Sequence, residues 1–342
     1  MANRPLSAAT ALALGLAAER VARRVRGRTV DLSGRVALVT GGSRGLGLAL
    51  AQELAREGCR VAICARTEGP LERARSRLEA MGADVLAEQC DVSDREQVER
   101  LVAHVTDRLG PIDVLVNVAG VIAVGPVSAQ TLEDYEEAMD ILYWGVVHPT
   151  FAVLPSMRER GGGYIVNVTS IGGKISVPHL LSYNAAKFAA VGFSEGLHAG
   201  VAKEGIHVLT VVPGLMRTGS YLNAYFKGDR RLEYGLFAPL ATLPLTTISG
   251  RRAARRIVRA TKEKRAEITL TLHANLLARA NGIAPGLTAE ALSVVDRLLP
   301  DPGQRTNRTR GYRIDVPAVD SVVAKLSRRS VSRFNQLGAD ES

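Results

Sequence analysis

A tyrosine and a lysine four residues apart, Tyr183 and Lys187, are the pair in this sequence best suited to acid–base chemistry. Residues 182–203 are expected to form a helix, so both side chains project from one face. A phenol of pKa about 10 exchanges protons poorly at neutral pH, but a nearby ammonium favours the phenolate and lowers that pKa. Such a pair suits protonation of the alkoxide that forms when a carbonyl accepts a hydride. The alternative is a buried core tyrosine.

A glycine-rich stretch, TGGSRGLG at residues 40–47, carries the second chemical signal. It lies between the apolar, β-branched run 36–40 and a helical pattern over 46–55. Glycines in such a turn let the backbone approach a pyrophosphate, and the following helix presents unpaired N–H groups and the positive end of its dipole. The context predicts dinucleotide binding. A purely structural turn is the alternative.

The end of the second predicted strand indicates which dinucleotide is preferred. A site that prefers NAD places a carboxylate there to hold the ribose 2′-hydroxyl, whereas this strand ends in Cys64, Ala65 and Arg66. Arg66 and Arg44 could both reach a 2′-phosphate and form charge-assisted hydrogen bonds with it. We therefore expect NADP(H) as the cofactor. The alternative for either arginine is a charge that faces solvent.

These residues require an alternating β/α framework to bring them together. Short apolar runs at 36–40, 61–64, 85–88, 114–118, 164–168, 208–212 and 267–272 alternate with helical patterns. Strands that are apolar throughout predict a doubly wound parallel sheet of the Rossmann type, with helices on both faces. We assign residues 31–275 to this domain, including a substrate-covering segment at 215–250. Residues 1–30 form an N-terminal extension, and 276–342 a C-terminal extension whose polar tail is expected to be partly disordered.

The TGxxxGxG spacing is the first of several features by which residues 32–275 resemble the short-chain dehydrogenase/reductase family. CDV at 90–92, NVAG at 117–120, Ser170, YNAAK at 183–187 and Pro213-Gly214 follow in the order typical of that family. The ordered set is highly specific. With Arg66 added from the argument above, the expected cofactor-binding residues are Gly41, Ser43, Arg44, Gly45, Leu46, Gly47, Arg66, Asp91, Val92, Asn117, Ala119, Gly120, Tyr183, Lys187, Pro213, Gly214 and Thr218.

The resemblance also implies a catalytic set of Ser170, Tyr183 and Lys187, in which Ser170 orients the substrate oxygen and Tyr183 transfers the proton. One position departs from the family pattern. Counting back from Gly145 places Leu142 where an asparagine usually holds a water relay to the lysine. Leucine cannot bind that water. The main alternative to an oxidoreductase is therefore an NADP(H)-binding sensor or scaffold with weak catalysis, and the next is epimerisation or dehydration on the same fold.

Charge and composition indicate which kinds of partner the protein can bind. The net charge of +10 is concentrated in peripheral segments, 1–35, 251–265 and 303–342, and aromatic residues make up only 4% of the chain. This pattern does not favour nucleic-acid binding; it suits simple solvation or contact with an anionic membrane. The apolar run Pro5–Ala18 is too short to span a bilayer, so it is either an interfacial helix or a helix that is packed on the protein or left mobile.

Three cysteines and six histidines show no metal-ligand spacing, and we expect no metal. A reducing compartment and the position of the arginines after the apolar run predict a cytoplasmic protein, with membrane-surface association left open. The resemblance leaves a homo-oligomer open as well.

A small carbonyl or alcohol is the expected substrate. Its apolar character is suggested by the covering residues Tyr221, Leu222, Tyr225, Phe226, Leu236, Phe237 and Leu240. His179 is interpreted as structural, with substrate contact as the alternative.

Overall fold

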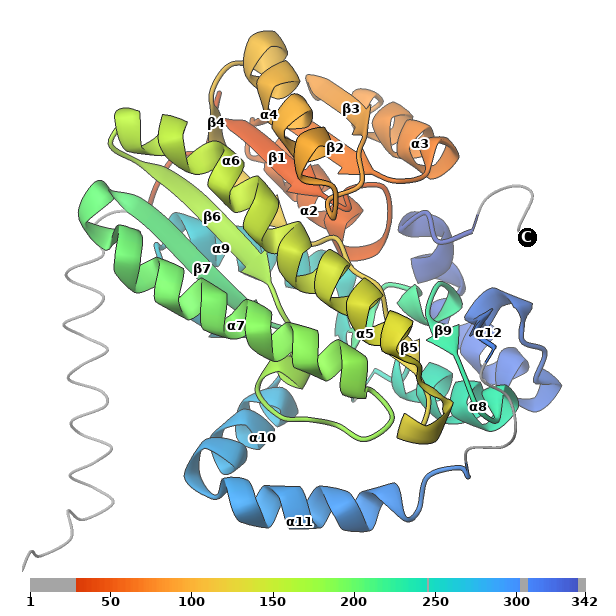
Figure 1. Cartoon of the computed structure of the whole chain (residues 1–342). Coiled ribbons are helices and arrows are strands. Elements are labelled where there is room, and N and C mark those ends of the chain that lie inside the picture. Colours follow the sequence, from red (N-terminus) through yellow and green to blue (C-terminus); the bar gives the residue numbers. More distant parts are fainter. Residues whose placement is uncertain (1–28, 245, 302–306, 338–342) are drawn as a thin grey trace, which may run out of the picture.

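The computed structural model describes residues 29–244, 246–301 and 307–337. A seven-stranded parallel sheet forms its centre, in the order β11-β7-β6-β4-β1-β2-β3 (Figure 1). The strands are β1 (Val36–Thr40), β2 (Arg60–Ala65), β3 (Val85–Gln89), β4 (Ile112–Asn117), β6 (Gly163–Val168), β7 (Ile206–Val212) and β11 (Glu267–Thr269). This confirms the predicted doubly wound fold. The strand order reverses between β1 and β4, which is where such sheets bind ligands, beyond the carboxyl ends of the strands.

Helices cover both faces of the sheet because the central strands are apolar on both sides. One face packs on α2 (Gly45–Arg56), α3 (Glu68–Glu79) and α9 (Gly250–Lys262). The other packs on α4 (Arg95–Leu109), α6 (Gly145–Glu159) and α7 (Leu181–Val201). Most of the basic segment 251–265 forms α9, whose Ala254, Ile257 and Val258 are buried against the sheet while its arginines lie mostly on the other faces.

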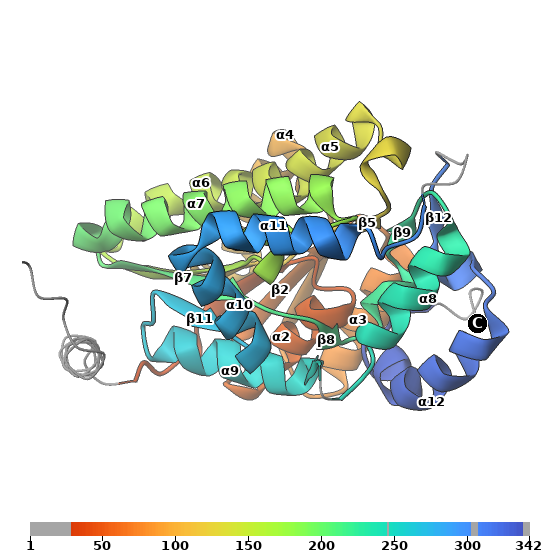
Figure 2. The ribbon, with the colours of Figure 1, turned by 90° about the horizontal axis from the view of Figure 1, so that it is seen from below.

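The segment after β7 builds a second, smaller layer beside the sheet. It contains β8 (Met216–Arg217), β9 (Tyr225–Phe226), α8 (Arg230–Leu240) and β10 (Ile248–Ser249). β9 pairs with β5 (Ala123–Val124) and with β12 (Thr309–Arg310), so the C-terminal region is joined to this layer. The last helix, α12 (Pro317–Arg333), packs against α8, as Figure 2 shows from below.

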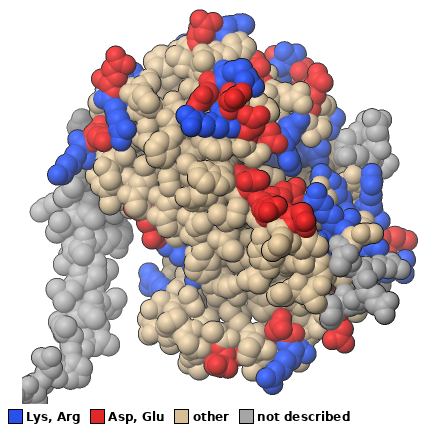
Figure 3. All heavy atoms as spheres, viewed as in Figure 1, with Lys and Arg blue, Asp and Glu red and all other residues tan. Residues whose placement is uncertain are grey.

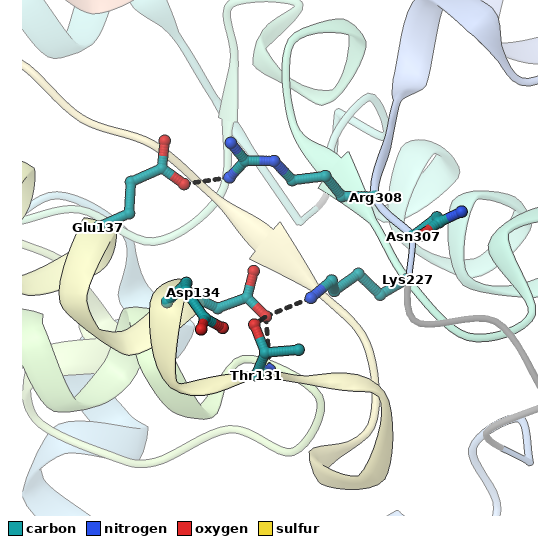
Figure 4. A pocket seen from close by; sticks show the side chains of 7 residues that line it. Thr131, Asp134, Glu137, Lys227, Asn307 and Arg308 are labelled. Atoms are coloured by element: carbon teal, nitrogen blue, oxygen red, sulfur yellow. Dashed lines mark hydrogen bonds and ion pairs between the residues drawn. The ribbon is translucent and has the colours of Figure 1, made fainter.

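Ion pairs join this layer to α5 (Leu132–Met139). In the polar hollow of Figure 4, Lys227 reaches Asp134, and Arg308 reaches Glu137. The side chains of Asp134 and Lys227 are each 5% exposed. Asp134 also accepts hydrogen bonds from the backbone N–H and hydroxyl of Thr131, which caps α5. A buried ion pair that makes further hydrogen bonds tolerates only a narrow range of geometries. These contacts therefore hold the smaller layer in a defined position against α5.

Two apolar surfaces stand out. The face in Figure 3 carries few charged side chains over α6 and α7, where Phe151 and Phe188 are 59% and 42% exposed. The second surface is the hairpin of α10 (Leu272–Ile283) and α11 (Pro285–Asp296), on which Leu276, Ile283 and Leu287 are exposed. Among the described residues, no helix is both long and apolar enough to cross a membrane. The run Pro5–Ala18 lies outside them.

Candidate active site

Ser170, Tyr183 and Lys187 come together beyond the carboxyl end of β6. Tyr183 and Lys187 lie one turn apart in α7, and the Lys187 ammonium nitrogen is 5.9 Å from the centre of the Tyr183 ring. Ser170 follows β6 and shares a hydrogen bond with the Tyr183 hydroxyl. The Gly172 N–H donates to Ser170 Oγ at 3.0 Å and orients that hydroxyl. The arrangement brings together an alcohol, a phenol and an amine, of which Ser170 and Lys187 are buried and Tyr183 is partly buried.

Burial dominates the electrostatics of this group. It raises the pKa of Tyr183, and the hydrogen bond with Ser170 opposes that rise only in part. Burial also lowers the pKa of Lys187 to about 8. The Lys187 ammonium donates to the carbonyl oxygen of Val168 at 2.9 Å and is 5% exposed. The protein groups alone therefore do not lower the pKa of Tyr183, although the sequence predicts such an effect for lysine together with the oxidised nicotinamide.

Leu142 lies beside Tyr183. It is 1% exposed and belongs to a small apolar cluster with Ala138, Ile141 and Ala186, against which Tyr183 packs. The helix around it is interrupted by a π-helical turn at Asp140–Trp144, a distortion often found at functional sites. The side chain is apolar, so it offers no hydrogen bond to a proton relay at this position.

The glycine-rich turn has the close backbone approaches that glycine permits. Gly41 has a φ of 64°, and a Cβ atom on Gly47 would lie 2.2 Å from the Gly41 carbonyl oxygen. The Thr40 hydroxyl oxygen accepts hydrogen bonds from the N–H groups of Val118 and Ala119 at 3.1 and 3.4 Å. The turn and the 117–120 segment are therefore adjacent, as the cofactor prediction requires.

The side chain of Asn117 supports the sheet. Its amide nitrogen donates to Asn167 Oδ1 at 2.9 Å and to the Thr150 hydroxyl at 3.2 Å. Asn167 in turn donates to Ser194 at 3.0 Å. The sequence missed Asn167 and Ser194, because isolated polar residues in a buried strand and a long helix carry no spacing signal.

The residues predicted to bind the adenosine end lie at the ends of neighbouring strands. Arg66, after β2, forms an ion pair with Asp91, after β3, with 3.7 Å between their charged atoms. Arg44 donates to Asn223 Oδ1 at 2.6 Å. Val92 is buried and limits the space at Gly145, where a Cβ atom would lie 2.6 Å from it.

The residues predicted to bind the nicotinamide end lie in the segment after β7. The Ile171 N–H donates to the Pro213 carbonyl oxygen at 2.8 Å, which joins this segment to the Ser170 loop. Gly214 lies against Thr271 and His273, which leave no space for a Cβ atom. Thr218 is 2% exposed and lies 3.9 Å from the place of a Cβ atom on Gly45. The predicted cofactor residues thus lie at the carboxyl ends of the parallel strands β1, β2, β3, β4, β6 and β7 or in the segments that follow these strands.

His179 is a buried partner of the covering segment. Its Nδ1 lies 2.6 Å from Glu233 Oε1 in α8, and its φ is 62°. This contact holds the loop before Tyr183 against α8. No group of three or more His, Cys, Asp or Glu side chains suited to a metal occurs among the described residues.

Comparisons with known proteins agree with this arrangement. The family model described as short chain dehydrogenase matches residues 35–224. The putative oxidoreductase SadH of Mycobacterium tuberculosis is 34% identical over 277 residues, which are 80% of this chain and 94% of that protein.

Two solved structures of similar fold contain nicotinamide cofactors. A short-chain dehydrogenase/reductase from Burkholderia phymatum in complex with NAD is 25% identical, with a TM-score of 0.68 over 75% of this chain and 96% of that one. L-sorbose reductase from Gluconobacter frateurii, complexed with NADPH and L-sorbose, is 28% identical, with a TM-score of 0.63 over 70% and 97%.

Proposed function

The chain belongs to the short-chain dehydrogenase/reductase family, and on that premise we propose that it is an NADP(H)-dependent oxidoreductase acting on a ketone or secondary alcohol. The observation that carries the proposal is the group of Ser170, Tyr183 and Lys187, which lies beyond the carboxyl end of β6, at the same end of the parallel sheet as the glycine-rich turn after β1. The fit of a dinucleotide is supported by the turn itself, because Cβ atoms on Gly41 and Gly47 would clash with Ala119 and with the Gly41 carbonyl oxygen, so glycines at these positions permit the tight turn that a pyrophosphate site uses.

In this proposal the bound nicotinamide supplies or accepts the hydride. During reduction, the Tyr183 hydroxyl donates its proton to the substrate oxygen, and the Ser170 hydroxyl orients that oxygen by a hydrogen bond. The charge of the Lys187 ammonium stabilises the phenolate left on Tyr183. A solvent proton then restores the phenol. Alcohol oxidation runs the same steps in reverse, with Tyr183 phenolate as the base.

The preference for NADP(H) is supported by the groups at the ends of β1 and β2. Arg44 lies in the glycine-rich turn after β1 and Arg66 directly follows β2, so both come from segments expected to surround the ribose 2′-phosphate, and β2 ends without a carboxylate. Purified protein with NADPH and NADH, measured side by side across a broad ketone library, tests this. We expect the Michaelis constant for NADPH to be at least tenfold lower, and a lower value for NADH contradicts the preference.

An apolar substrate is supported by the surface around the catalytic group rather than by the aromatic residues of the covering segment. Phe226 and Tyr234 pack within that segment's own core. The α10–α11 hairpin, however, exposes Leu276, Ile283 and Leu287 and is fixed next to the Ser170 loop by a hydrogen bond from Asn281 to the Lys174 carbonyl oxygen at 2.9 Å. The library should therefore give its highest efficiencies with long-chain or polycyclic ketones. Highest efficiency with small charged oxoacids would contradict this.

A cofactor-binding sensor with weak turnover is the second candidate, and Leu142 beside Tyr183 is the observation that favours it. The two functions differ in one measurement. A sensor binds NADPH but gives the same low turnover with and without the Tyr183 hydroxyl, whereas an enzyme loses turnover in the Tyr183→Phe variant.

Association with a membrane surface is a further proposal, supported by the sequence of residues 5–28 and by the exposed leucines of α10 and α11. Flotation with anionic liposomes tests it. The full chain should float, and a chain beginning at Asp31 should float less. Equal flotation of both would remove the N-terminal segment from the proposal.

A further inference from the structure

The last residues that the structure describes lie against the glycine-rich turn, although they are almost 300 positions away in the sequence. We call Phe334–Gln336 the C-terminal clamp. Its three residues are 2–3% exposed. The Gly45 N–H donates to the Phe334 carbonyl oxygen at 2.9 Å. The Phe334 ring lies 2.9 Å from the place that a Cβ atom on Gly250 would take, so only glycine leaves room for it there.

The clamp begins with the C-terminal cap of α12. Asn335 has a φ of 55°, and its N–H and that of Gln336 donate to the carbonyl oxygens of Ser332 and Val331 at 3.4 and 3.1 Å. This is the Schellman arrangement, in which the left-handed position is usually glycine and sometimes asparagine. Backbone geometry alone would therefore favour glycine at this position. The asparagine side chain must be explained by what it contacts.

Both polar atoms of the Asn335 side chain form hydrogen bonds with other residues of the protein. Its amide nitrogen donates to the carbonyl oxygens of Ser43 at 2.9 Å and Pro70 at 2.8 Å. Its Oδ1 accepts from Arg73 Nε at 3.0 Å. Ser43 belongs to the glycine-rich turn, and Pro70 lies in the first turn of α3, four residues after Arg66. Asn335 thus joins the two segments that carry Arg44 and Arg66.

Gln336 joins the C-terminal clamp to the segment after β7, which is expected to lie near the nicotinamide. Its side-chain and backbone carbonyl oxygens accept from Asn223 Nδ2 at 2.8 and 3.0 Å. Its backbone oxygen also accepts from Arg44 at 3.3 Å. Asn223 follows the segment that begins at Thr218, so the clamp contacts three of the segments expected to surround the coenzyme phosphates.

From these contacts we propose that Asn335 is a positioning residue of the coenzyme site: it fixes the separation between the glycine-rich turn and the start of α3, and thereby the binding of the adenosine 2′-phosphate. Arginine pairs bind phosphate well only when their planar groups are held at the right spacing. The clamp supplies that spacing from outside the nucleotide-binding motif. This inference rests on the proposed NADP(H) function.

Two variants of the full chain separate this role from the helix cap. Asn335→Gly keeps the left-handed backbone and removes the side chain. Asn335→Asp keeps the size and the partner Arg73 but cannot donate to the Ser43 and Pro70 carbonyl oxygens. The matched control is Ser327→Ala, which removes another buried contact of α12, the 2.7 Å hydrogen bond to the Tyr221 hydroxyl, without removing a hydrogen bond of the C-terminal clamp.

NADPH and NADH binding is measured by fluorescence titration, and turnover is measured separately at saturating coenzyme. We expect both Asn335 variants to raise the NADPH Kd at least tenfold, to raise the NADH Kd less, and to change kcat less than twofold. Ser327→Ala should leave both Kd values within twofold of the unaltered protein, whatever its melting temperature. An NADPH Kd that is unchanged or lowered in the Asn335 variants overturns the inference, as does an equal rise in the control.

The unaltered protein distinguishes this failure from failure of the proposed function. If it binds neither coenzyme, or prefers NADH, the proposed NADP(H) function is wrong, and the 2′-phosphate role of Asn335 fails with it. If it prefers NADPH and the Asn335 variants bind NADPH as tightly as the unaltered protein does, only the positioning role is wrong.

Discussion

Replacing Lys187 by methionine should stabilise the protein near pH 7, although it removes a group to which we assign a role in catalysis. Burial lowers the pKa of Lys187 from 10.5 to about 8, so the folded chain holds this proton less tightly than the unfolded chain does. At 1.36 kcal/mol per pKa unit, keeping the ammonium in the folded state costs about 3 kcal/mol near pH 7. The Lys187→Met variant avoids that cost.

The variant also loses the hydrogen bond to the Val168 carbonyl oxygen, which is worth about 1 kcal/mol. The expected net gain near pH 7 is therefore about 2 kcal/mol in the free energy of unfolding. The stability of the unaltered protein should rise as the pH increases from about 8 towards 10.5, because the folded chain has lost the proton that the unfolded chain still binds. Near pH 10 the remaining cost is about 1 kcal/mol, and the two proteins should be equally stable.

Urea unfolding near pH 7 and near pH 10 measures this difference. Lys203→Met is the matched control, because Lys203 is exposed and should show no gain at either pH. A Lys187→Met protein that is less stable than the unaltered protein near pH 7, or a gain that does not change with pH, would refute the description of Lys187 as a buried ammonium.

Three further expectations concern the coenzyme and the proton path. The kcat/KM for ketone reduction should fall as the pH rises above about 8, because Lys187 then loses the charge that stabilises the Tyr183 phenolate; a flat profile to pH 10 would contradict that role. Arg66→Asp places a carboxylate at the end of β2, next to Asp91, and should raise the Michaelis constant for NADPH at least tenfold with little change for NADH; equal changes for both coenzymes would count against the 2′-phosphate site. Leu142→Asn should lower the free energy of unfolding by about 2–4 kcal/mol, since it buries an amide in an apolar cluster. The same variant should raise kcat, because it places a polar group at the relay position. A kcat that falls would show that Leu142 does not limit proton transfer.

The alternating β/α framework could be predicted from the sequence, because each strand and helix is recognised from a local pattern of residues. Each central strand is a short apolar run, and each flanking helix has its own period, so the order β1-α2-β2-α3-β3-α4-β4 can be predicted without knowing any distant contact. The family resemblance is confirmed by the match over residues 35–224. The predicted catalytic residues are also brought together, since Tyr183 and Lys187 share a helix and Ser170 ends the strand beside it.

The contacts that were not predicted join residues far apart in the chain. Asn335 meets Ser43, and Glu233 meets His179, through single hydrogen bonds between segments that have no common period. Asn335 lies in a polar, basic stretch whose composition indicates disorder, and only its left-handed backbone and its neighbours in space show its role. The pKa of Tyr183 was equally beyond prediction, because desolvation depends on the packing around the ring rather than on the spacing to Lys187.

The claim that Tyr183 transfers the proton is tested most directly by NADPH oxidation with the best ketone substrate, in the unaltered protein and in Tyr183→Phe, together with NADPH binding in both. The phenylalanine ring keeps the packing against Leu142 and removes only the hydroxyl. We expect kcat to fall by at least a factor of about 10³ while the NADPH Kd changes less than threefold. A variant that binds NADPH normally and retains more than a tenth of the original kcat would contradict the mechanism.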